Sequence, residues 1–240
     1  MLPKIDLPTY EVKLPSNEKV LTIRPFLVKE EKLLLMALES GDDNYIINTT
    51  KQIISNCVLT EGFNVDKIPF FDVDYLFIAL RAKSVGENIE VKFTCNNSVN
   101  GIKCGNIFPA KIDITNCRIV KNETVLNKIQ LGPQTMVQMK YPNYTTMKIL
   151  SSDENIMERK IKVMASCIEQ IVDKDSVYSS KDFTREEAVQ FVENLKQEQF
   201  KKLELFVDNF PSFLVTTDAS CNKCGFVHKI EYGDFASFFV

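Results

Sequence analysis

The 240-residue sequence contains a single histidine, His228, and only 8 glycines. A Ser-His-Asp or Cys-His catalytic arrangement would therefore have one candidate base, and no nucleophile-elbow or phosphate-loop glycine pattern occurs in the chain. So few glycines also disfavour a backbone cradle for phosphate groups. We therefore expect a protein that is not an enzyme and that has no small-molecule substrate.

Long apolar runs are also missing. No uninterrupted apolar run exceeds six residues, the length of Leu33–Leu38, whereas a membrane-spanning helix needs roughly 20. The opening segment Met1–Pro8 carries Lys4 and Asp6 and has no continuous apolar core, so it does not resemble a secretory signal. We expect no membrane partner and a protein that stays in the cytoplasm of the cell that makes it.

An excess of basic residues is absent as well. The chain has 29 Lys and Arg against 32 Asp and Glu, which gives a formal net charge of −3, and the two signs are interspersed along the sequence. Nucleic-acid binders usually show a basic patch, because much of their affinity comes from neutralising phosphates and releasing counterions. We therefore expect no nucleic-acid partner.

Hydrophobic periodicity predicts alternating β and α segments along the chain. Strands alternate apolar and polar residues, helices show apolar residues at three- and four-residue spacing, and Asp42, Asp72 and Thr184 are expected helix N-terminal caps. The predicted elements are a β-hairpin over 10–23, helices over about 25–40, 43–57 and 72–85, a hairpin of strands 89–95 and 107–114, strands within 117–142, a helix from about 153 to 171, a helical stretch over 184–207 and a final β segment over 213–240.

Two of the predicted strand-turn-strand units place a cysteine pair in the turn. These pairs are Cys95 with Cys104, and Cys221 with Cys224, and a glycine follows the second cysteine of each pair. A Cys-x-x-Cys-Gly turn is a zinc knuckle, in which two thiolates converge on one metal and the glycine permits the required backbone angle. Four thiolates leave no open position on a tetrahedral ion, so the four cysteines predict a structural Zn²⁺ site.

The first knuckle departs from the short form, because the eight residues 96–103 separate its cysteines. The turn-rich segment 97–101 is expected to loop out and leave Cys104 in the role of Cys224. Four buried thiols without a metal are the alternative interpretation. His228 lies four residues past Cys224 and either replaces one cysteine as a ligand or takes a strand position facing solvent or the core. The remaining cysteines, Cys57, Cys117 and Cys167, are interpreted as core residues.

These patterns predict an α+β fold in which β-hairpins form a zinc-ribbon-like base, with N-terminal helices before it and a helical segment inserted within it. The sequence suggests an N-terminal hairpin plus helical lobe over 1–88, a zinc-ribbon-like β lobe over 89–116 and 212–240, and an inserted strand and helical segment over 117–211. No flexible linker separates these parts, so we expect them to form one compact unit.

Five runs, Ile23–Lys32, Phe71–Glu87, Met139–Pro142, Cys221–Gly225 and Asp234–Phe239, are spread in order over nearly the whole chain. They resemble the baseplate hub proteins of T-even-like contractile-tailed bacteriophages. The resemblance implies a protein built into the tail baseplate hub or acting as a chaperone on it, without enzymatic activity. The resemblance implies that the partners are hub and tail proteins, and it is compatible with an oligomer in the assembled baseplate. It also implies a location in the host cytoplasm during assembly or in the virion tail. The family has the short knuckle at both cysteine pairs, from which the Cys95–Cys104 spacing departs.

The candidate partner-binding residues are charged side chains at the ends of the predicted first and third helices: Arg24, Lys29, Glu30, Lys83 and Glu87. A helix with one apolar and one charged stripe is suited to docking, although a solvated outer face or a helix C-cap explains the same residues.

Two other functions are compatible with the cysteine pattern. A zinc-ribbon nucleic-acid-binding protein would gather basic residues around the knuckle, where Lys223 and Lys229 are few. An enzyme using Cys224 and His228 would need a thiolate free of metal.

Overall fold

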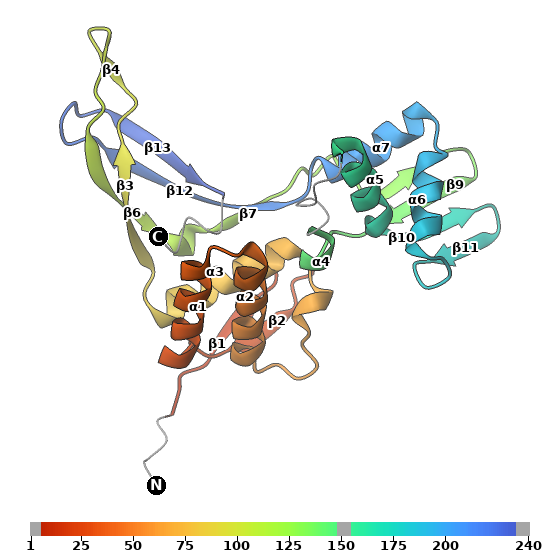
Figure 1. Ribbon diagram of the computed structural model, residues 1–240, viewed down its shortest axis with the longest axis horizontal. Coiled ribbons are helices and arrows are strands. Elements are labelled where there is room, and N and C mark those ends of the chain that lie inside the picture. Colours follow the sequence, from red (N-terminus) through yellow and green to blue (C-terminus); the bar gives the residue numbers. More distant parts are fainter. Residues whose placement is uncertain (1–5, 148–154, 234–240) are drawn as a thin grey trace. The chain divides into compact units, whose positions relative to one another are not determined.

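The N-terminal part of the chain combines a β-hairpin with three helices, as the sequence predicts. In the computed structural model, which describes residues 6–147 and 155–233, the hairpin is antiparallel. Its strands are β1 (Tyr10–Lys13) and β2 (Val20–Ile23), and the helices are α1 (Val28–Ser40), α2 (Asp43–Cys57) and α3 (Phe70–Ser84) (Figure 1). The predicted cap of α2 is confirmed, because the Asp42 side chain accepts hydrogen bonds from the backbone N–H groups of Asn44 and Tyr45 at 2.8 and 3.2 Å.

Helix α3 is buried on almost all sides, so it forms the centre of this part of the fold. The prediction that Asp72 caps this helix is wrong, because α3 begins two residues earlier, at Phe70. The Asp72 side chain is instead fully buried and accepts hydrogen bonds from the backbone N–H of Ser16, at 3.0 Å, and from the Ser16 hydroxyl. Burial raises the pKa of Asp72, and the two hydrogen bonds from Ser16 oppose that rise.

A buried ion pair lies at the start of α1. The Glu30 side chain is 0% exposed, and its Oε1 accepts a hydrogen bond from Arg24 Nη2 at 3.0 Å. Its Oε2 accepts from the backbone N–H of Leu27 at 2.8 Å, which satisfies one of the free amides at the helix N-terminus. The pair therefore fixes how the chain enters α1 from β2.

Antiparallel strands carry the cysteine pairs. Strand β3 (Asn88–Thr94) pairs with β6 (Ile107–Asp113), and β12 (Ser212–Ser220) lies between β13 (Val227–Tyr232) and β7 (Arg118–Val120). The two hairpins β3–β6 and β12–β13 are called the cysteine ribbon below. They lie side by side in Figure 1, and the Thr217 hydroxyl of β12 donates to the Lys111 carbonyl of β6 at 3.1 Å. The small hairpin of β4 (Ser98–Val99) and β5 (Ile102–Lys103) extends from the end of β3.

The rest of the chain forms a four-stranded antiparallel sheet covered by helices. The sheet order is β11-β10-β9-β8. Its strands are β8 (Lys128–Gln130), β9 (Thr135–Met139), β10 (Ile168–Asp173) and β11 (Ser176–Ser179), and the helices are α4 (Tyr144–Met147), α5 (Ile156–Cys167), α6 (Arg185–Glu193) and α7 (Gln197–Val207). The core between sheet and helices contains Val137, Met139, Ile168, Val163, Met164, Ala188, Val192, Leu203 and Phe206.

Two predictions for this region are wrong in detail, and one hairpin is missing from them. The helix expected over about 153–171 ends at Cys167, and Ile168–Asp173 forms strand β10. Its expected start at Asp153, like the run Asp234–Phe239, lies outside the described residues. The helical stretch expected over 184–207 is two helices, because the chain leaves helical geometry between Glu193 and Gln197. The hairpin of β10 with β11 is not predicted at all.

The chain divides into two compact units, each with its own core. Among the described residues, the first unit contains 6–65, 71–120 and 212–233, and the second contains 66–70, 121–147 and 155–211. The mixed α+β class is as predicted, whereas the three-part division with boundaries at 88, 116 and 212 stays a prediction. Within the described part of the chain, no helix combines the length and apolarity that crossing a membrane requires.

Candidate metal centre

The turns that close the two hairpins of the cysteine ribbon have the same backbone hydrogen bonds. The Cys95 N–H donates to the Asn106 carbonyl at 2.8 Å, and the Cys221 N–H donates to the Phe226 carbonyl at 2.9 Å. The N–H of the glycine after the second cysteine then donates to the carbonyl of the first, at 3.1 Å for Gly105 and 2.9 Å for Gly225. Cys104 therefore occupies the position in its turn that Cys224 occupies in the other.

Both glycines have a left-handed backbone, with φ of 59° at Gly105 and 70° at Gly225. A side chain would be strained at these positions, which explains why glycine follows each second cysteine. The extra residues between Cys95 and Cys104 fold on themselves as the β4–β5 hairpin, whose turn residues Asn100 and Gly101 also have positive φ. The long spacing therefore leaves the knuckle geometry unchanged.

The four cysteines meet at one point, although 116 residues (105–220) separate Cys104 from Cys221. Their Sγ atoms all lie within 4.8 Å of one another. The Sγ atoms of Cys95 and Cys224 are 3.6 Å apart, and those of Cys104 and Cys221 are 3.9 Å apart. These separations are far longer than the sulfur–sulfur bond of a disulfide, about 2 Å, and all seven cysteines are free.

The separations fit a tetrahedral metal site. With a zinc–sulfur bond of about 2.3 Å, the edge of a tetrahedron of four thiolates is about 3.8 Å. Soft thiolates favour Zn²⁺ or iron over the hard ions Mg²⁺ and Ca²⁺, and four protein ligands leave no position for a substrate. Cys95 and Cys221 are buried, and Cys104 and Cys224 are partly buried. This arrangement could hold a metal whose role is structural.

The backbone around Cys221 favours a thiolate. Burial raises the pKa of this thiol, but hydrogen bonds from the backbone N–H groups of Cys224 and Lys223 and from the Asn106 side chain outweigh burial and lower the pKa to about 6. At Cys95, burial dominates and raises the pKa to about 12, and hydrogen bonding to the other three sulfurs acts in the same direction. Four sulfurs this close cannot all ionise unless a cation balances their charge.

Three side chains outside the set of four donate hydrogen bonds to the sulfurs or contact them. Asn106 Nδ2 lies 3.5 Å from Cys221 Sγ, and Asn97 Nδ2 lies 3.7 Å from Cys224 Sγ. His228 Nε2 lies 3.1 Å from Cys95 Sγ. Such contacts orient ligands and disperse their negative charge in metal sites.

His228 lies beside the four cysteines. Its ring nitrogens do not belong to the group of four mutually close atoms, which are the Sγ atoms of the cysteines. It is 5% exposed on β13, and its ring contacts the rings of Phe93, Phe108 and Phe226 with centroids 5.2, 5.8 and 4.8 Å away. Of the interpretations left open by the sequence, this geometry matches a core position that reaches one ligand.

The sequence analysis missed Asn97 and Asn106. A signal was available, because Asn97 follows Cys95 by two residues and Asn106 directly follows the Cys104-Gly105 pair. Side chains so close to a knuckle are well placed to reach its sulfurs. Of the aromatic rings around His228, Phe93 and Phe108 lie on β3 and β6 and Phe226 directly precedes β13, and the spacing of Phe93 and Phe108 in the sequence does not indicate that they meet His228.

The candidate partner-binding residues lie in two different environments. Glu30 is fully buried and Arg24 is 13% exposed, and the two side chains form an ion pair with each other inside the first unit. The side chains of Lys29, Lys83 and Glu87 are 70%, 36% and 48% exposed, and Lys83 forms an ion pair with Glu87 at 2.8 Å. Partner binding by these residues stays a prediction, and the side chains of Lys29, Lys83 and Glu87 are more exposed than that of Arg24, whereas Glu30 is not exposed.

Comparison with known protein families identifies the family of this chain. The model of the family described as "T4 bacteriophage base plate protein" matches residues 7–240, nearly the whole chain and both halves of the cysteine cluster. No curated protein matches significantly, and no solved structure does. Because the match runs through both compact units, the chain belongs to the family of T4 bacteriophage base plate proteins.

Proposed function

We propose that the protein is a structural or assembly protein of the phage tail baseplate hub, that it works through contacts with other hub and tail proteins, and that it is not an enzyme. The observation that carries this proposal is the family match over residues 7–240. The resemblance of the five runs to hub proteins supports the hub within the baseplate. Its expected place is the virion tail, reached from the host cytoplasm, and the proposal includes no nucleic-acid, membrane or small-molecule partner.

The proposal includes a structural Zn²⁺ held by Cys95, Cys104, Cys221 and Cys224, which makes the cysteine ribbon a zinc-ribbon-like base. The sulfur separations of 3.6 and 3.9 Å and the matched turns support it. Bound zinc would supply a rigid link between two hairpins that are distant in the sequence and would perform no reaction. The Asn97, Asn106 and His228 side chains would hold the thiolates in position.

A phage that cannot make the protein tests the hub role. A phage with a stop codon early in this gene is expected to yield heads without complete tails, because a baseplate lacking a hub component does not initiate a tail. Electron microscopy of the lysate and titration of infectious particles measure this, and the wild-type gene supplied from a plasmid should restore both. Mass spectrometry of purified particles then shows whether the protein remains in the baseplate. Intact baseplates and an undiminished titre from the deleted phage would rule out the proposed role.

Thiol labelling tests the metal site. We expect Cys95, Cys104, Cys221 and Cys224 to resist iodoacetamide in the native protein and to react once a chelator is added. Cys57 and Cys167 are internal controls that should resist under both conditions, because each is 0% exposed and burial raises their pKa values to about 11 and 12. Elemental analysis with native mass spectrometry should find one zinc per chain. Rapid labelling of Cys224 before chelation would show that the site is not closed by a metal.

A further inference from the structure

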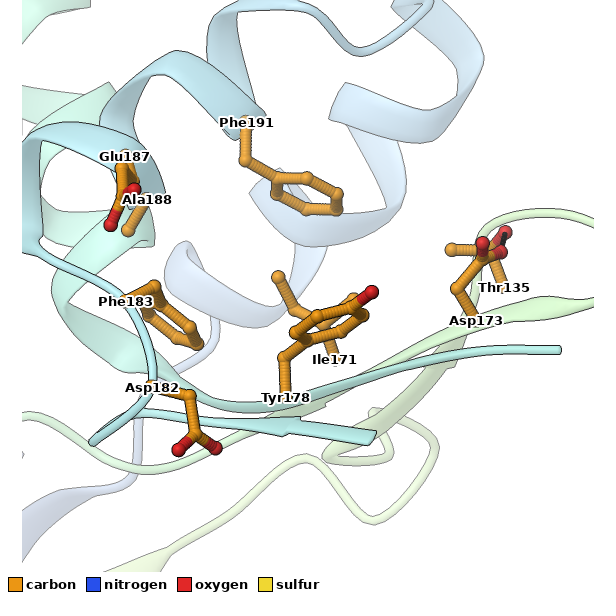
Figure 2. A pocket seen from close by; sticks show the side chains of 9 residues that line it. All are labelled: Thr135, Ile171, Asp173, Tyr178, Asp182, Phe183, Glu187, Ala188 and Phe191. Carbon is orange, nitrogen blue, oxygen red and sulfur yellow. Dashed lines mark hydrogen bonds between the residues drawn. The ribbon is translucent and has the colours of Figure 1, made fainter. Parts of the chain in front are cut away.

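The second unit has a cavity where its core reaches the surface. The cavity measures about 540 Å³ and lies between strands β10 and β11 and the start of helix α6, within the size range of typical ligand sites. Its inner wall is formed by Ile171 and Ala188, which belong to the core of this unit. Figure 2 shows the rings of Tyr178, Phe183 and Phe191 around the same space. The apolar wall is therefore largely aromatic.

Carboxylates are among the residues that line the cavity, and the one nearby cation that acts on them among the described residues is Lys181, which helps to lower the pKa of Asp182. Asp173, Asp182 and Glu187 are among its lining residues, and no lysine or arginine is. In Figure 2, Asp173 lies on one side of the rings, and Asp182 and Glu187 lie on the other. Each carboxylate is also anchored. Asp173 accepts from the Thr135 hydroxyl at 2.7 Å, Asp182 accepts from the Ser179 N–H and hydroxyl, both at 2.7 Å, and Glu187 accepts from the Thr184 N–H at 2.6 Å.

The hydrogen bonds that anchor two of these carboxylates also lower their pKa values. The hydrogen bond from the Ser179 hydroxyl, followed by that from its N–H, lowers the pKa of Asp182. The hydrogen bond from the Thr184 N–H, followed by that from its hydroxyl, lowers the pKa of Glu187. The fold holds these carboxylates in position, so binding a cation between them would not require them to rearrange.

We propose that this cavity receives a lysine or arginine side chain from another protein of the baseplate. Such a side chain has an aliphatic stem and a cationic head, which matches an apolar wall with an acidic border. The aromatic rings add a specific attraction, because the face of a ring draws a cation within about 6 Å of its centroid. Tyr178, on the outer strand β11, is 48% exposed, so a partner can reach the rings from outside. An acidic partner would be repelled by the three carboxylates, and a purely apolar partner would add no charge to balance them.

Small probes test this inference on the full-length protein. We expect n-butylguanidinium and n-butylammonium to shift the NMR signals of Tyr178, Phe183 and Phe191 in a saturable way. The neutral isostere n-pentanol and the anion valerate should bind about fivefold or more weakly. Equal or tighter binding of pentanol would assign the cavity to an apolar group. Preferential binding of valerate, or no shift at these rings with any probe, would also overturn the proposal.

Charge-removing variants locate the effect. Asp173→Asn, Asp182→Asn and Glu187→Gln keep the hydrogen-bond acceptors while removing the charge, and glutamine preserves the capping box of α6. The triple variant should bind n-butylguanidinium about tenfold more weakly and n-pentanol unchanged. If it does not fold, the single variants should each show part of the loss.

Glu186→Gln is the matched control, because Glu186 lies in the same first turn of α6 without lining the cavity. A loss equal to that of Glu187→Gln would refute the assignment. The residues that line the cavity are distant in sequence from the four clustered cysteines, so failure of this proposal would not affect the proposed metal site or hub role.

Discussion

Removing the proposed Zn²⁺ should unfold the knuckle end of the cysteine ribbon and leave the helix-covered sheet of the second unit intact. A Cys221→Ser/Cys224→Ser variant, or the wild type treated with a strong chelator, is expected to lose on the order of 10 kcal/mol of apparent folding free energy in the ribbon. The reason is the small size of the apolar core at the knuckles, where the buried cluster among the described residues consists of Cys95, Phe108 and Cys221, with His228 buried beside them. Without the metal, little apolar burial remains to hold the two turns.

Hydrogen exchange read by mass spectrometry separates the two regions. Peptides from the knuckle ends of β3, β6, β12 and β13 should lose their protection. The far ends of β3, β6 and β12 should keep theirs, because they share a buried apolar cluster with α3, and so should α5, α6 and α7, which pack on the separate core of the second unit. Cys117→Ser is the matched control, since Cys117 is a cysteine of the same unit outside the cluster. Unchanged protection of the ribbon in the double variant would show that apolar packing alone holds the knuckles, and the proposed structural role of zinc would fail.

The cluster could be predicted from sequence because its determinants are local. Each knuckle needs a strand, two cysteines and a glycine, and all of these are visible within about ten residues. The inserted β4–β5 hairpin did not hide the pattern, because Asn100-Gly101 is itself a strong turn signal that closes the extra residues on themselves. The contact of His228 with Cys95 was open from sequence alone, since it depends on how two hairpins face each other.

The misassigned segments are those where a distant partner decides the structure. Ile168 and Ile171 continue the apolar stripe of α5 at helical spacing, yet the chain becomes strand β10 because β9 and β11 are there to pair with it. The same error concealed the cavity beside β11. Asp72 has a residue type that is common at helix caps, but it lies inside α3, and the approach of Ser16, 56 positions away, shows its actual role. Periodicity identifies local preference, and it carries no information on these long-range pairings.

Replacing Arg24 should destabilise the first unit far more than replacing any surface cation. Arg24→Ala would leave the Glu30 carboxylate, 0% exposed, without the guanidinium at 3.0 Å, and Lys29 Nζ, at 3.6 Å, belongs to a side chain that is 70% exposed. Removing one partner of a buried ion pair typically costs about 3–5 kcal/mol, because the remaining charge stays buried and uncompensated. Urea unfolding at neutral pH measures the loss. Lys13→Ala is the matched control: it breaks the exposed Lys13–Glu18 pair, at 3.1 Å, and should cost less than about 1 kcal/mol.

The pH dependence distinguishes this electrostatic cause from lost packing. In the wild type, burial raises the pKa of Glu30, but the Leu27 N–H and Arg24 outweigh it and hold the pKa below its ordinary value of 4.5. Glu30 therefore contributes stability that is present above pH 4.5 and is lost as the pH falls through the lowered pKa of the folded state. In Arg24→Ala, burial without the guanidinium should raise that pKa, so protonation relieves the buried charge. The difference in unfolding free energy between the two proteins should then shrink as the pH falls toward 4.5.

The double variant Arg24→Met/Glu30→Gln should recover part of the loss at neutral pH, because it removes both charges. A difference independent of pH, with no recovery in the double variant, would assign the effect to packing.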